Sequence, residues 1–509
     1  MKAFHFTWTG MLAAIVVAGA PAIALAGKSN DTLIYASDSE PENISPYHNN
    51  LREGVIVARH VFDTLIYRDP ATGKYLPQLA TSWNWIDPKT LELTIRKGVA
   101  FHNGDPLTAD DVVFTLNYVV SPEAKVVTKQ NVDWIKSAEK VGEDIVRIHL
   151  AGTFPAAIEY LAGPVPIYPA NYFKKVGLTG FAKAPIGSGP YRVTAVEPGK
   201  GVTMEKNTNY WKGSPQGQPS IGKLVFRIIP DAETRMAELM IGGVDWIWRV
   251  PNDQAKQLKT VPNISVLSAE TMRVGFLQFD SLGRTPGAEP FKDVRVRQAI
   301  AHAIDRKSML TNLVGDGARI MNAACFIDQF GCTDKGIPTY DYNPAKAKQL
   351  LAEAGFPNGF KTELYAYRER EYAEAVVGYL RAVGIQANLN YLKYAAMREQ
   401  IRGGKVPITF QTWGSFSVAD ASAFTGVWFK GTQDDMSHDD EVKNLLTVAD
   451  TSVDSEKRLG TYAEALKRIA EKAYLLPLFS YPANYAFTST LQFAAQPDEL
   501  PRFYEARWK

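Results

Sequence analysis

The stretch LPQLATSWNWIDPKTLELTIRKGVAFHNGDPLTADDVVFTLNYV, residues 76–119, contains a predicted strand followed by a predicted helix. Its part LELTIRKGVAF alternates apolar and polar residues, which is typical of a half-buried strand. Thr108 then stands where a helix cap is needed, with Asp111 three residues later. One face of the following helix is apolar and is made by Val112, Val113, Leu116, Val119 and Val120. This pattern predicts an amphipathic helix packed against a core.

Helix boundaries are equally readable further along the chain. Residues 290–310, PFKDVRVRQAIAHAIDRKSML, predict a long helix capped by Asp293, with basic residues along it. In NPAKAKQLLAEAGF, Asn343 is the expected cap, Pro344 occupies the first turn and Gly355 lies just past the end. The sequence therefore predicts several regular helices with defined ends.

Strands and helices alternate in the second half of the sequence. KTELYAYRER (361–370), a helix ending at RAVG (381–384) and IQANLNYL (385–392) follow one another in strand–helix–strand order. This order is typical of a βαβ unit with parallel strands. Clustered Pro, Asn and Gly turns separate such units elsewhere. The predicted fold class is α/β, with two lobes built on mixed sheets.

The length and composition of the chain limit its possible domain number and partners. The chain has 509 residues, 46% of them hydrophobic, and a formal net charge of +2. It is long enough for two or three packed domains, and its charge balance argues against a nucleic-acid partner.

The first residues resemble an export signal. Lys2 precedes an apolar stretch, residues 11–25, and Ala24-Leu25-Ala26 offers a small-residue cleavage site, so residues 1–26 are predicted to be a cleavable signal peptide. A retained helix is the alternative, although the apolar part is short for a membrane anchor. Because Gly27 and not a cysteine stands directly after the predicted cut, we expect no lipid anchor and a periplasmic location.

The chain has two cysteines, Cys325 and Cys332, in AACFIDQFGCTDK. In an oxidising compartment they are close enough to form a disulfide, which would stabilise the fold by about 2–3 kcal/mol. A thiolate metal site is the alternative, but it needs further Cys or His ligands nearby.

The sequence lacks the common catalytic motifs. GSG at 187–189 does not have the Gly-x-Ser-x-Gly spacing of a nucleophile elbow, and neither a His-Glu-x-x-His pair nor a phosphate-binding loop is present. DDMSHDDE (434–441) could be a metal patch, but a helix start at Ser437 with acids at its positive end explains it more simply. A pair of carboxylates for sugar hydrolysis stays open as a minority hypothesis. We expect no catalytic residue, no cofactor and no metal.

Several segments, including residues 76–119, 291–306 and 345–356 described above, make the sequence similar to a known family. It resembles the peptide/nickel class of bacterial extracellular solute-binding proteins, family 5, which serve ABC importers. The segments that carry the resemblance are residues 76–119, 187–193, 205–211, 291–306, 345–356 and 475–487. The resemblance covers nearly the whole chain after the predicted signal. It implies a two-lobe periplasmic-binding-protein fold of the large class, which closes on its ligand about a hinge.

The resemblance also implies domain boundaries. Lobe I would consist of residues 27–54, 187–280 and 482–509, with an inserted subdomain at 55–186, and lobe II would span 281–481.

In relatives, the segment corresponding to QTWGSFSVADASAF (411–424) carries an acid that binds the α-ammonium of a peptide. Here Trp413 and Gly414 are followed by Ser415, Phe416 and Ser417, so the acid is missing. Burying an ammonium without a counter-charge costs several kcal/mol, which disfavours a short peptide bound in the usual orientation. Asp420 would take over this role or cap the next helix. We expect Trp413 to line the ligand pocket, with Ser415 and Ser417 offering neutral hydrogen bonds; core packing is the alternative for Trp413.

Other ligand contacts are implied at two places. Arg368 or Arg370, at the end of a predicted strand, would hold a ligand carboxylate, unless both pair with neighbouring acids at the surface. Tyr47, His48 and Asn49 occupy a loop that borders the pocket in relatives or forms an exposed turn.

These observations predict a monomeric, non-catalytic receptor that binds peptides or peptide-like solutes and delivers them to the permease subunits and ATPase of an ABC importer. A non-peptide solute such as an opine, a sugar derivative or a small organic anion is the first alternative, and an exported hydrolase is the second. Nickel transport is disfavoured because no pair of histidines stands out in the sequence.

Overall fold

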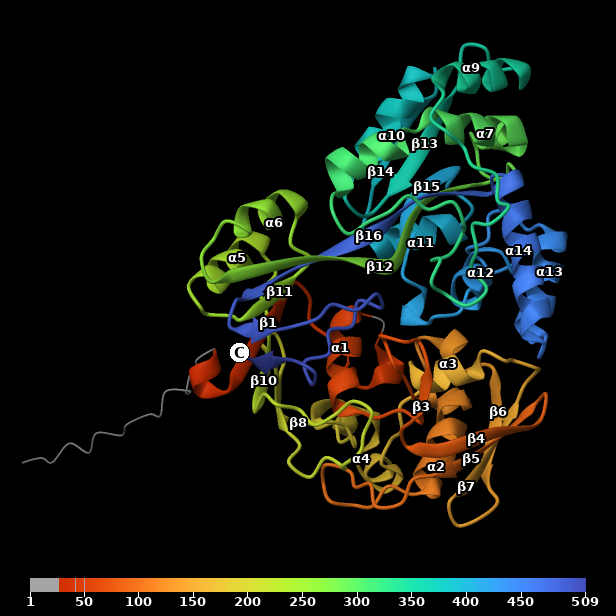
Figure 1. Cartoon of the computed structure of the whole chain (residues 1–509). Coiled ribbons are helices and arrows are strands. Elements are labelled where there is room, and N and C mark those ends of the chain that lie inside the picture. The colour runs from red at the N-terminus through yellow and green to blue at the C-terminus, as the bar shows by residue number, and fades with distance from the viewer. Residues whose placement is uncertain (1–26, 42, 50) are drawn as a thin grey trace, which may run out of the picture.

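The computed structural model describes residues 27–41, 43–49 and 51–509. The predicted signal peptide, residues 1–26, lies outside this described part. The chain forms two bodies joined by long strands (Figure 1). The lower body in this view contains the first half of the chain and its end, and the upper body contains most of the second half.

A ten-stranded mixed sheet runs through both bodies. In spatial order its strands are β14 (Gln386–Tyr391), β13 (Lys361–Ala366), β15 (Ile408–Trp413), β12 (Ile264–Phe279), β16 (Leu475–Thr488), β11 (Trp246–Trp248), β1 (Thr32–Ser37), β10 (Lys223–Ile228), β9 (Gly201–Lys206) and β8 (Tyr191–Glu197). β13 and β14 are parallel and are joined through α10 (Arg370–Ala382), so the predicted βαβ unit is confirmed. The α/β fold class with mixed sheets is also confirmed.

β12 and β16 are the strands that cross between the bodies (Figure 1). They pair antiparallel along most of their length, and the register shifts between Glu270 and Val274 of β12. A bulge bends a strand and interrupts its ladder of hydrogen bonds. The shift thus marks the place where the sheet turns from one body to the other, close to the boundary expected between lobe I and lobe II.

Residues 66–183 form a smaller unit of the lower body. It contains a four-stranded antiparallel sheet, β4 (Ala80–Asp87), β5 (Thr90–Ile95), β7 (Ile145–Leu150) and β6 (Ile135–Lys140), with a short pair, β2 (Ile66–Arg68) and β3 (Tyr75–Pro77). Its helices are α2 (Ala109–Val120), α3 (Ala157–Ala162) and α4 (Ala170–Lys183). The predicted capping box of α2 is present, with the backbone and hydroxyl of Thr108 donating to Asp111 at 2.9 and 3.0 Å.

The remaining helices lie on the large sheet or on one another. They are α1 (Arg52–Val61), α5 (Ala232–Met240), α6 (Asn252–Leu258), α7 (Val294–Ala303), α8 (Arg306–Met309), α9 (Pro344–Glu353), α11 (Tyr394–Arg402), α12 (Ser422–Trp428), α13 (Asp440–Thr451) and α14 (Ser455–Glu471). A last pair of short strands is β17 (Leu491–Gln492) and β18 (Arg507–Trp508). Within the described residues, no helix combines the length and apolar character needed to cross a membrane.

Helix caps are confirmed at Asp293 and Asn343, whose side chains accept hydrogen bonds from backbone amides of the first turn. The long helix expected at 290–310 is instead broken after Ala303, because Asp305 caps a separate helix, α8. The helix expected to start at Ser437 begins at Asp440, where Asp439 is the cap. In both cases an aspartate that the prediction did not use as a cap, Asp305 or Asp439, accepts hydrogen bonds from backbone amides and starts a helix.

Candidate ligand-binding site

Residues 413–422 run from the last residue of β15 to the first residue of α12 and lie where the two bodies meet. Three consecutive residues here, Ser415, Phe416 and Ser417, have left-handed backbones with φ of 50°, 52° and 64°. For residues other than glycine, each such conformation costs about 1–3 kcal/mol and persists only where the surroundings impose it. The segment is therefore held in place by its contacts.

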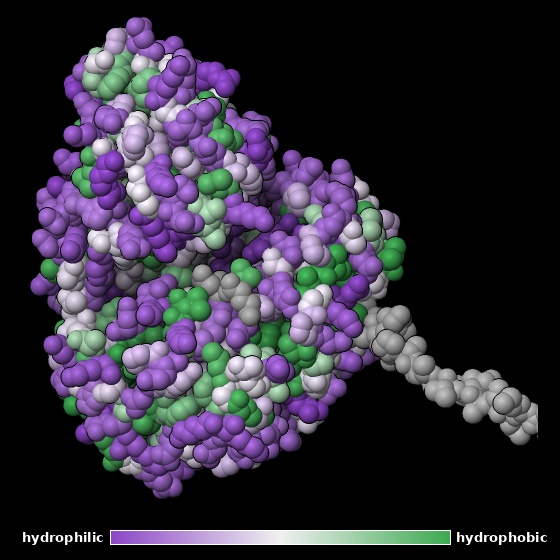
Figure 2. Space-filling view, turned by 180° about the vertical axis from the view of Figure 1, so that it is seen from behind, coloured by the Kyte–Doolittle hydropathy of each residue, from purple (hydrophilic) through white to green (hydrophobic). Residues whose placement is uncertain are grey.

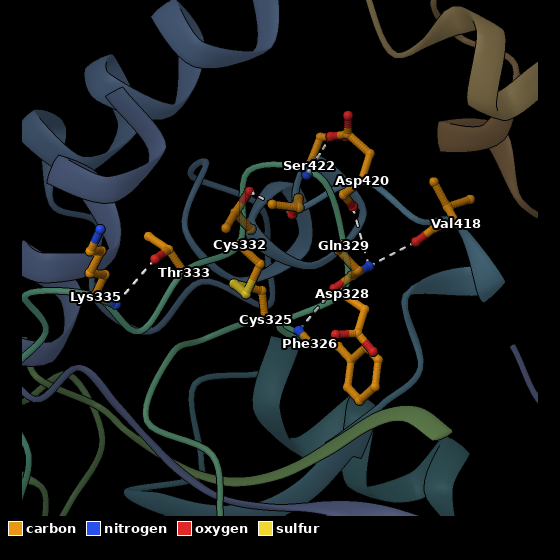
Figure 3. Close-up of a disulfide and its surroundings, with 12 residues drawn as sticks. Cys325, Phe326, Asp328, Gln329, Cys332, Thr333, Lys335, Val418, Asp420 and Ser422 are labelled. Atoms are coloured by element: carbon orange, nitrogen blue, oxygen red, sulfur yellow. Dashed lines mark hydrogen bonds between the residues drawn. A yellow bond between two sulfur atoms is a disulfide. The ribbon is translucent and has the colours of Figure 1, made fainter. Parts of the chain in front are cut away.

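The disulfide loop holds the segment from the side of the upper body (Figure 3). Cys325 and Cys332 form the predicted disulfide, with Cα atoms 5.9 Å apart. Within the loop that they close, Gln329 donates to the carbonyl oxygens of Val418 and Asp420 at 2.7 and 3.3 Å. The disulfide thus stabilises the loop whose Gln329 side chain holds the segment in place.

The lower body holds the same segment from the other side. Ser417 accepts a hydrogen bond from Arg52 at the start of α1 and donates to the Asp498 carbonyl at 2.6 Å. The Ala419 amide donates to the Glu159 carboxylate of α3 at 2.7 Å. Seen from behind, the surface is hollowed between the two bodies and hydrophilic residues border the hollow (Figure 2). The segment thus connects the two bodies directly.

Trp413 and Ser415 have different surroundings. The half-buried Trp413 indole donates to the Ala423 carbonyl at 3.0 Å and meets the rings of Phe416 and Trp428 edge-on. Ser415 is fully buried, and its hydroxyl has no hydrogen-bond partner among the described residues. A buried hydroxyl without a partner costs roughly 1–3 kcal/mol, so the position of Ser415 is a second local cost in this segment.

Asp420 is tied into the upper body. One oxygen of its buried carboxylate accepts from Arg458 at 2.9 Å, and the other accepts from the Ser422 amide at 3.0 Å, although the residue at the N-cap of α12 is Ala421. The structure thus gives this carboxylate a cationic partner within the protein and places it at the start of α12.

The two arginines after β13 differ in their surroundings. Arg368 pairs with Glu369 at 3.0 Å and lies 5.4 Å from the ring centre of Tyr481, with about a quarter of its side chain exposed (26%). Arg370 pairs with Glu374 at 2.8 Å and is exposed. Of the two, Arg368 is the one that faces the crossing strand β16.

Tyr47 and His48 are buried in the lower body. The Tyr47 hydroxyl donates to the Pro166 carbonyl at 2.6 Å, and His48 bonds to Ser45 and to the Ala124 carbonyl. Burial lowers the pKa of His48 below its ordinary value. The Asn49 amide donates to the Leu51 carbonyl at 2.6 Å. The structure thus places Tyr47 and His48 against residues 124–168 rather than beside Trp413.

Three charged residues that the sequence did not single out meet beside the segment. Two nitrogens of Arg273, in β12, donate hydrogen bonds to the Glu499 carboxylate at 3.1 and 2.9 Å. Arg52 donates to the same carboxylate at 2.8 Å. Burial alone raises the pKa of Glu499, but Arg273 and Arg52 outweigh it and hold that pKa well below its ordinary value. Arg52 lies close in sequence to the predicted 47–49 stretch, whereas nothing in the sequence links Glu499 to Arg273.

The acids of residues 434–441 bind nearby backbone amides and pair with arginines of other helices. Asp435 accepts hydrogen bonds from the Ser437 and His438 amides at 2.8 and 2.9 Å, and Asp439 caps α13. Within the part of the chain that the structure describes, no group of three His, Cys, Asp or Glu side chains is arranged to hold a metal ion.

Comparison with known proteins places the chain in a family. The sequence model described as "Bacterial extracellular solute-binding proteins, family 5 Middle" matches residues 74–436. Heme-binding protein A of Haemophilus influenzae is 29% identical, over 76% of this chain and 74% of that protein. Oligopeptide-binding protein AppA of Bacillus subtilis is 27% identical, over 77% and 76%. The solved structure of AgaA from A. tumefacien R10 in complex with agropinic acid superposes with a TM-score of 0.77 at 26% identity, covering 94% of this chain and 99% of that one. The chain belongs to the bacterial extracellular solute-binding proteins, family 5.

Proposed function

We propose that this protein is the substrate-binding component of an ABC importer and that it binds a peptide or peptide-like solute between its two lobes, next to residues 413–417. The observation that carries the proposal is the buried, unpartnered hydroxyl of Ser415 in a strained segment that both bodies hold. Strained backbone clusters at functional sites, and a buried polar group without a partner calls for an explanation such as an absent ligand.

Charge favours a solute without a free ammonium at this position. The carboxylates that contact residues 412–422, those of Asp420, Glu159 and Glu499, are each already paired with an arginine. An ammonium would therefore meet no available counter-charge, at a cost of several kcal/mol. We propose that the solute presents a neutral or blocked end to Trp413 and Ser415, and a carboxylate to an arginine.

A thermal-shift screen of the protein without residues 1–26 tests the proposal. The panel consists of di- to pentapeptides, the same peptides with acetylated N-termini, opines and oligosaccharides. A ligand that binds only the folded protein raises the melting temperature with the logarithm of its excess over Kd. N-acetylated or otherwise blocked peptides should give the larger shifts. A larger shift from free dipeptides would contradict the argument from charge.

An opine or another organic anion is the second candidate. It is favoured by the excess of guanidinium groups at the site and by the likeness to AgaA, which was solved with agropinic acid. The opines in the panel separate this candidate from peptides, because a peptide receptor should prefer blocked peptides to them.

We further propose that the protein binds its ligand without converting it. Its relatives are named as binding proteins. Incubation of each stabilising compound with the protein, followed by chromatography, should return the compound unchanged. Product that accumulates with time would favour the hydrolase alternative.

The proposed cellular location is the periplasm, after removal of residues 1–26, and the proposed partners are the permease subunits and ATPase of the importer. Fractionation of cells that express the full chain should recover a shortened, soluble product with the periplasmic contents. Recovery of the full-length chain in the membrane would favour a retained helix.

A further inference from the structure

The cluster of Arg52, Arg273 and Glu499 carries an excess of positive charge in a poorly exposed place. Their side chains are 11%, 14% and 10% exposed. Two guanidinium groups share one carboxylate, and a third arginine, Arg368, further lowers the pKa of Glu499 by its charge. Buried charges of like sign are costly unless a counter-charge lies between them. The two arginines thus form a place that requires an anion.

Glu499 supplies that anion from a strained position. It lies in the C-terminal tail, and its backbone has φ of 60°, which is left-handed for a residue other than glycine. Its carboxylate accepts a two-pronged bond from Arg273 and a further bond from Arg52. Arginine commonly recognises carboxylates, including those of ligands, through such planar bidentate hydrogen bonding. The tail therefore places a carboxylate where a ligand carboxylate would fit.

The arginine pair adjoins the candidate site. A Cβ atom on Gly414 would lie 3.1 Å from an Arg273 nitrogen and 3.2 Å from a Glu499 oxygen. The same Arg273 donates to the Thr412 hydroxyl at 3.3 Å, and Arg52 donates to Ser417. The absence of a side chain at Gly414 thus leaves the backbone of the segment directly against the ion cluster.

The pair also joins parts of the protein that move apart if the bodies open. Arg52 belongs to α1 in the lower body, whereas Arg273 lies within the register shift of β12, where the strand turns into the upper body. An anion held between them contacts both sides of the proposed hinge. Binding at this place would therefore be coupled to closure.

We infer that Arg52 and Arg273 form a carboxylate-binding site, that Glu499 occupies it in the protein without ligand, and that the carboxylate of an incoming solute replaces Glu499. This inference deepens the proposed function and rests on it. The exchange keeps the charges balanced, because one carboxylate leaves the arginines as another arrives. It also releases Glu499 from its strained backbone conformation. The ligand class is a solute with a free carboxylate near its neutral end.

The variant Glu499→Gly opens the proposed site while relieving the left-handed backbone, which glycine adopts at little cost. Propionate, which resembles the removed side chain, should raise the melting temperature of this variant in a saturable way at about millimolar concentration. Propionamide should not, because it lacks the charge. Glu499→Gln keeps the shape of the side chain and is the matched control, in which propionate should have no effect.

If Glu499→Gly does not fold without a ligand, its refolding yield replaces the melting temperature as the readout. The yield should be higher in propionate than in propionamide. Equal effects of the two compounds, or no effect of either, would overturn the inference.

A second measurement tests whether a larger solute uses the site. Acetyl-Ala-Ala should stabilise Glu499→Gly with an affinity at least about tenfold higher than that of its C-terminal amide, the ratio expected for one charged hydrogen bond. The ratio should be smaller in the wild type, where Glu499 competes. Equal ratios in the two proteins would mean that Glu499 only bridges the arginines, and would overturn the inference.

The two proposals fail separately. If the wild type binds panel solutes but Glu499→Gly ignores propionate, the inference fails and the proposed function stands. If no panel solute stabilises the wild type while propionate stabilises Glu499→Gly, the arginine site stands and the proposed ligand classes fail.

Discussion

Gly187 shows how a single missing Cβ shapes the packing of the lower body. A Cβ there would lie 2.0 Å from the Val61 carbonyl oxygen and 2.8 Å from the Phe62 ring. The GSG motif is therefore a packing motif in which the chain passes directly over the end of α1. Ser188, between the two glycines, donates to the buried Asp63 at 3.1 Å.

Gly187→Ala should destabilise the protein by at least about 2 kcal/mol, because the methyl group would collide with backbone that cannot move freely. Gly378→Ala is the matched control. Gly378 lies in α10 with open space around it, so alanine should leave stability unchanged or raise it by about 0.5–1 kcal/mol. Melting temperatures of the two variants check the prediction, and similar values for both would contradict it.

Asp63 makes stability depend on pH. Burial raises the pKa of its carboxyl to about 6, although Tyr210, Trp211, Ser188 and Gln78 donate hydrogen bonds that act in the opposite direction. A carboxyl with a raised pKa in the folded state binds its proton more tightly there than in the unfolded chain. Its contribution is therefore complete below about pH 4 and is lost as the pH rises to about 6.

A pKa that is higher by about two in the folded protein than in the unfolded chain corresponds to roughly 3 kcal/mol. The free energy of unfolding of the wild type, minus that of Asp63→Asn, should therefore fall by up to about this amount between pH 4 and pH 7. Denaturant unfolding at a series of pH values measures the difference. A difference that stays constant or rises with pH would contradict the assignment.

At the scale of elements, the strained turn after β15 predicts a conflict between stability and binding. Ser415→Gly removes both a left-handed non-glycine residue and a buried hydroxyl without a partner, so the variant should be more stable by about 1–2 kcal/mol. If a ligand uses that hydroxyl, the same variant should bind about tenfold more weakly.

Ser415→Ala separates the two effects. It loses the hydroxyl but keeps the strained backbone, so it should gain less stability than Ser415→Gly and lose a similar amount of affinity. Melting temperatures with and without the best solute of the panel measure both quantities. A glycine variant that is less stable than the wild type would show that the hydroxyl is satisfied in the unliganded protein.

At the scale of the whole molecule, the Glu159 side chain of the lower body forms a hydrogen bond to the upper body. Its buried carboxylate accepts the Ala419 amide at 2.7 Å and the Tyr75 hydroxyl at 2.9 Å. A hydrogen bond to a charged group contributes about 1.5–3 kcal/mol, which corresponds to roughly tenfold or more in the balance between closed and open forms.

Glu159→Ala should therefore open the unliganded protein and increase its radius of gyration in small-angle X-ray scattering. Glu143→Ala, at an exposed position of the same smaller unit (residues 66–183), is the control and should leave the radius unchanged. An identical radius for wild type and Glu159→Ala would show that this bond does not decide closure.

The sequence by itself determined what depends on neighbours along the chain. The capping box of α2, the caps Asp293 and Asn343 and the parallel βαβ unit follow from spacing and side-chain type, because helix and strand periodicity are local. The disulfide followed from two cysteines seven positions apart. The family followed from several short motifs in one order.

Only the tertiary structure decided which distant residues share a site. Arg273 and Glu499 are 226 positions apart, and Arg52 and Glu499 are 447 apart, so no periodicity links them. They meet because β12 crosses between the bodies and the C-terminal tail returns to the lower one. The same return of the chain places the Asp498 carbonyl against Ser417. Within the upper body, α14 brings Arg458 to Asp420, 38 positions away. Pairings of this kind depend on the order of strands in the sheet and on which buried charges need partners, and neither is written in the local pattern of residues.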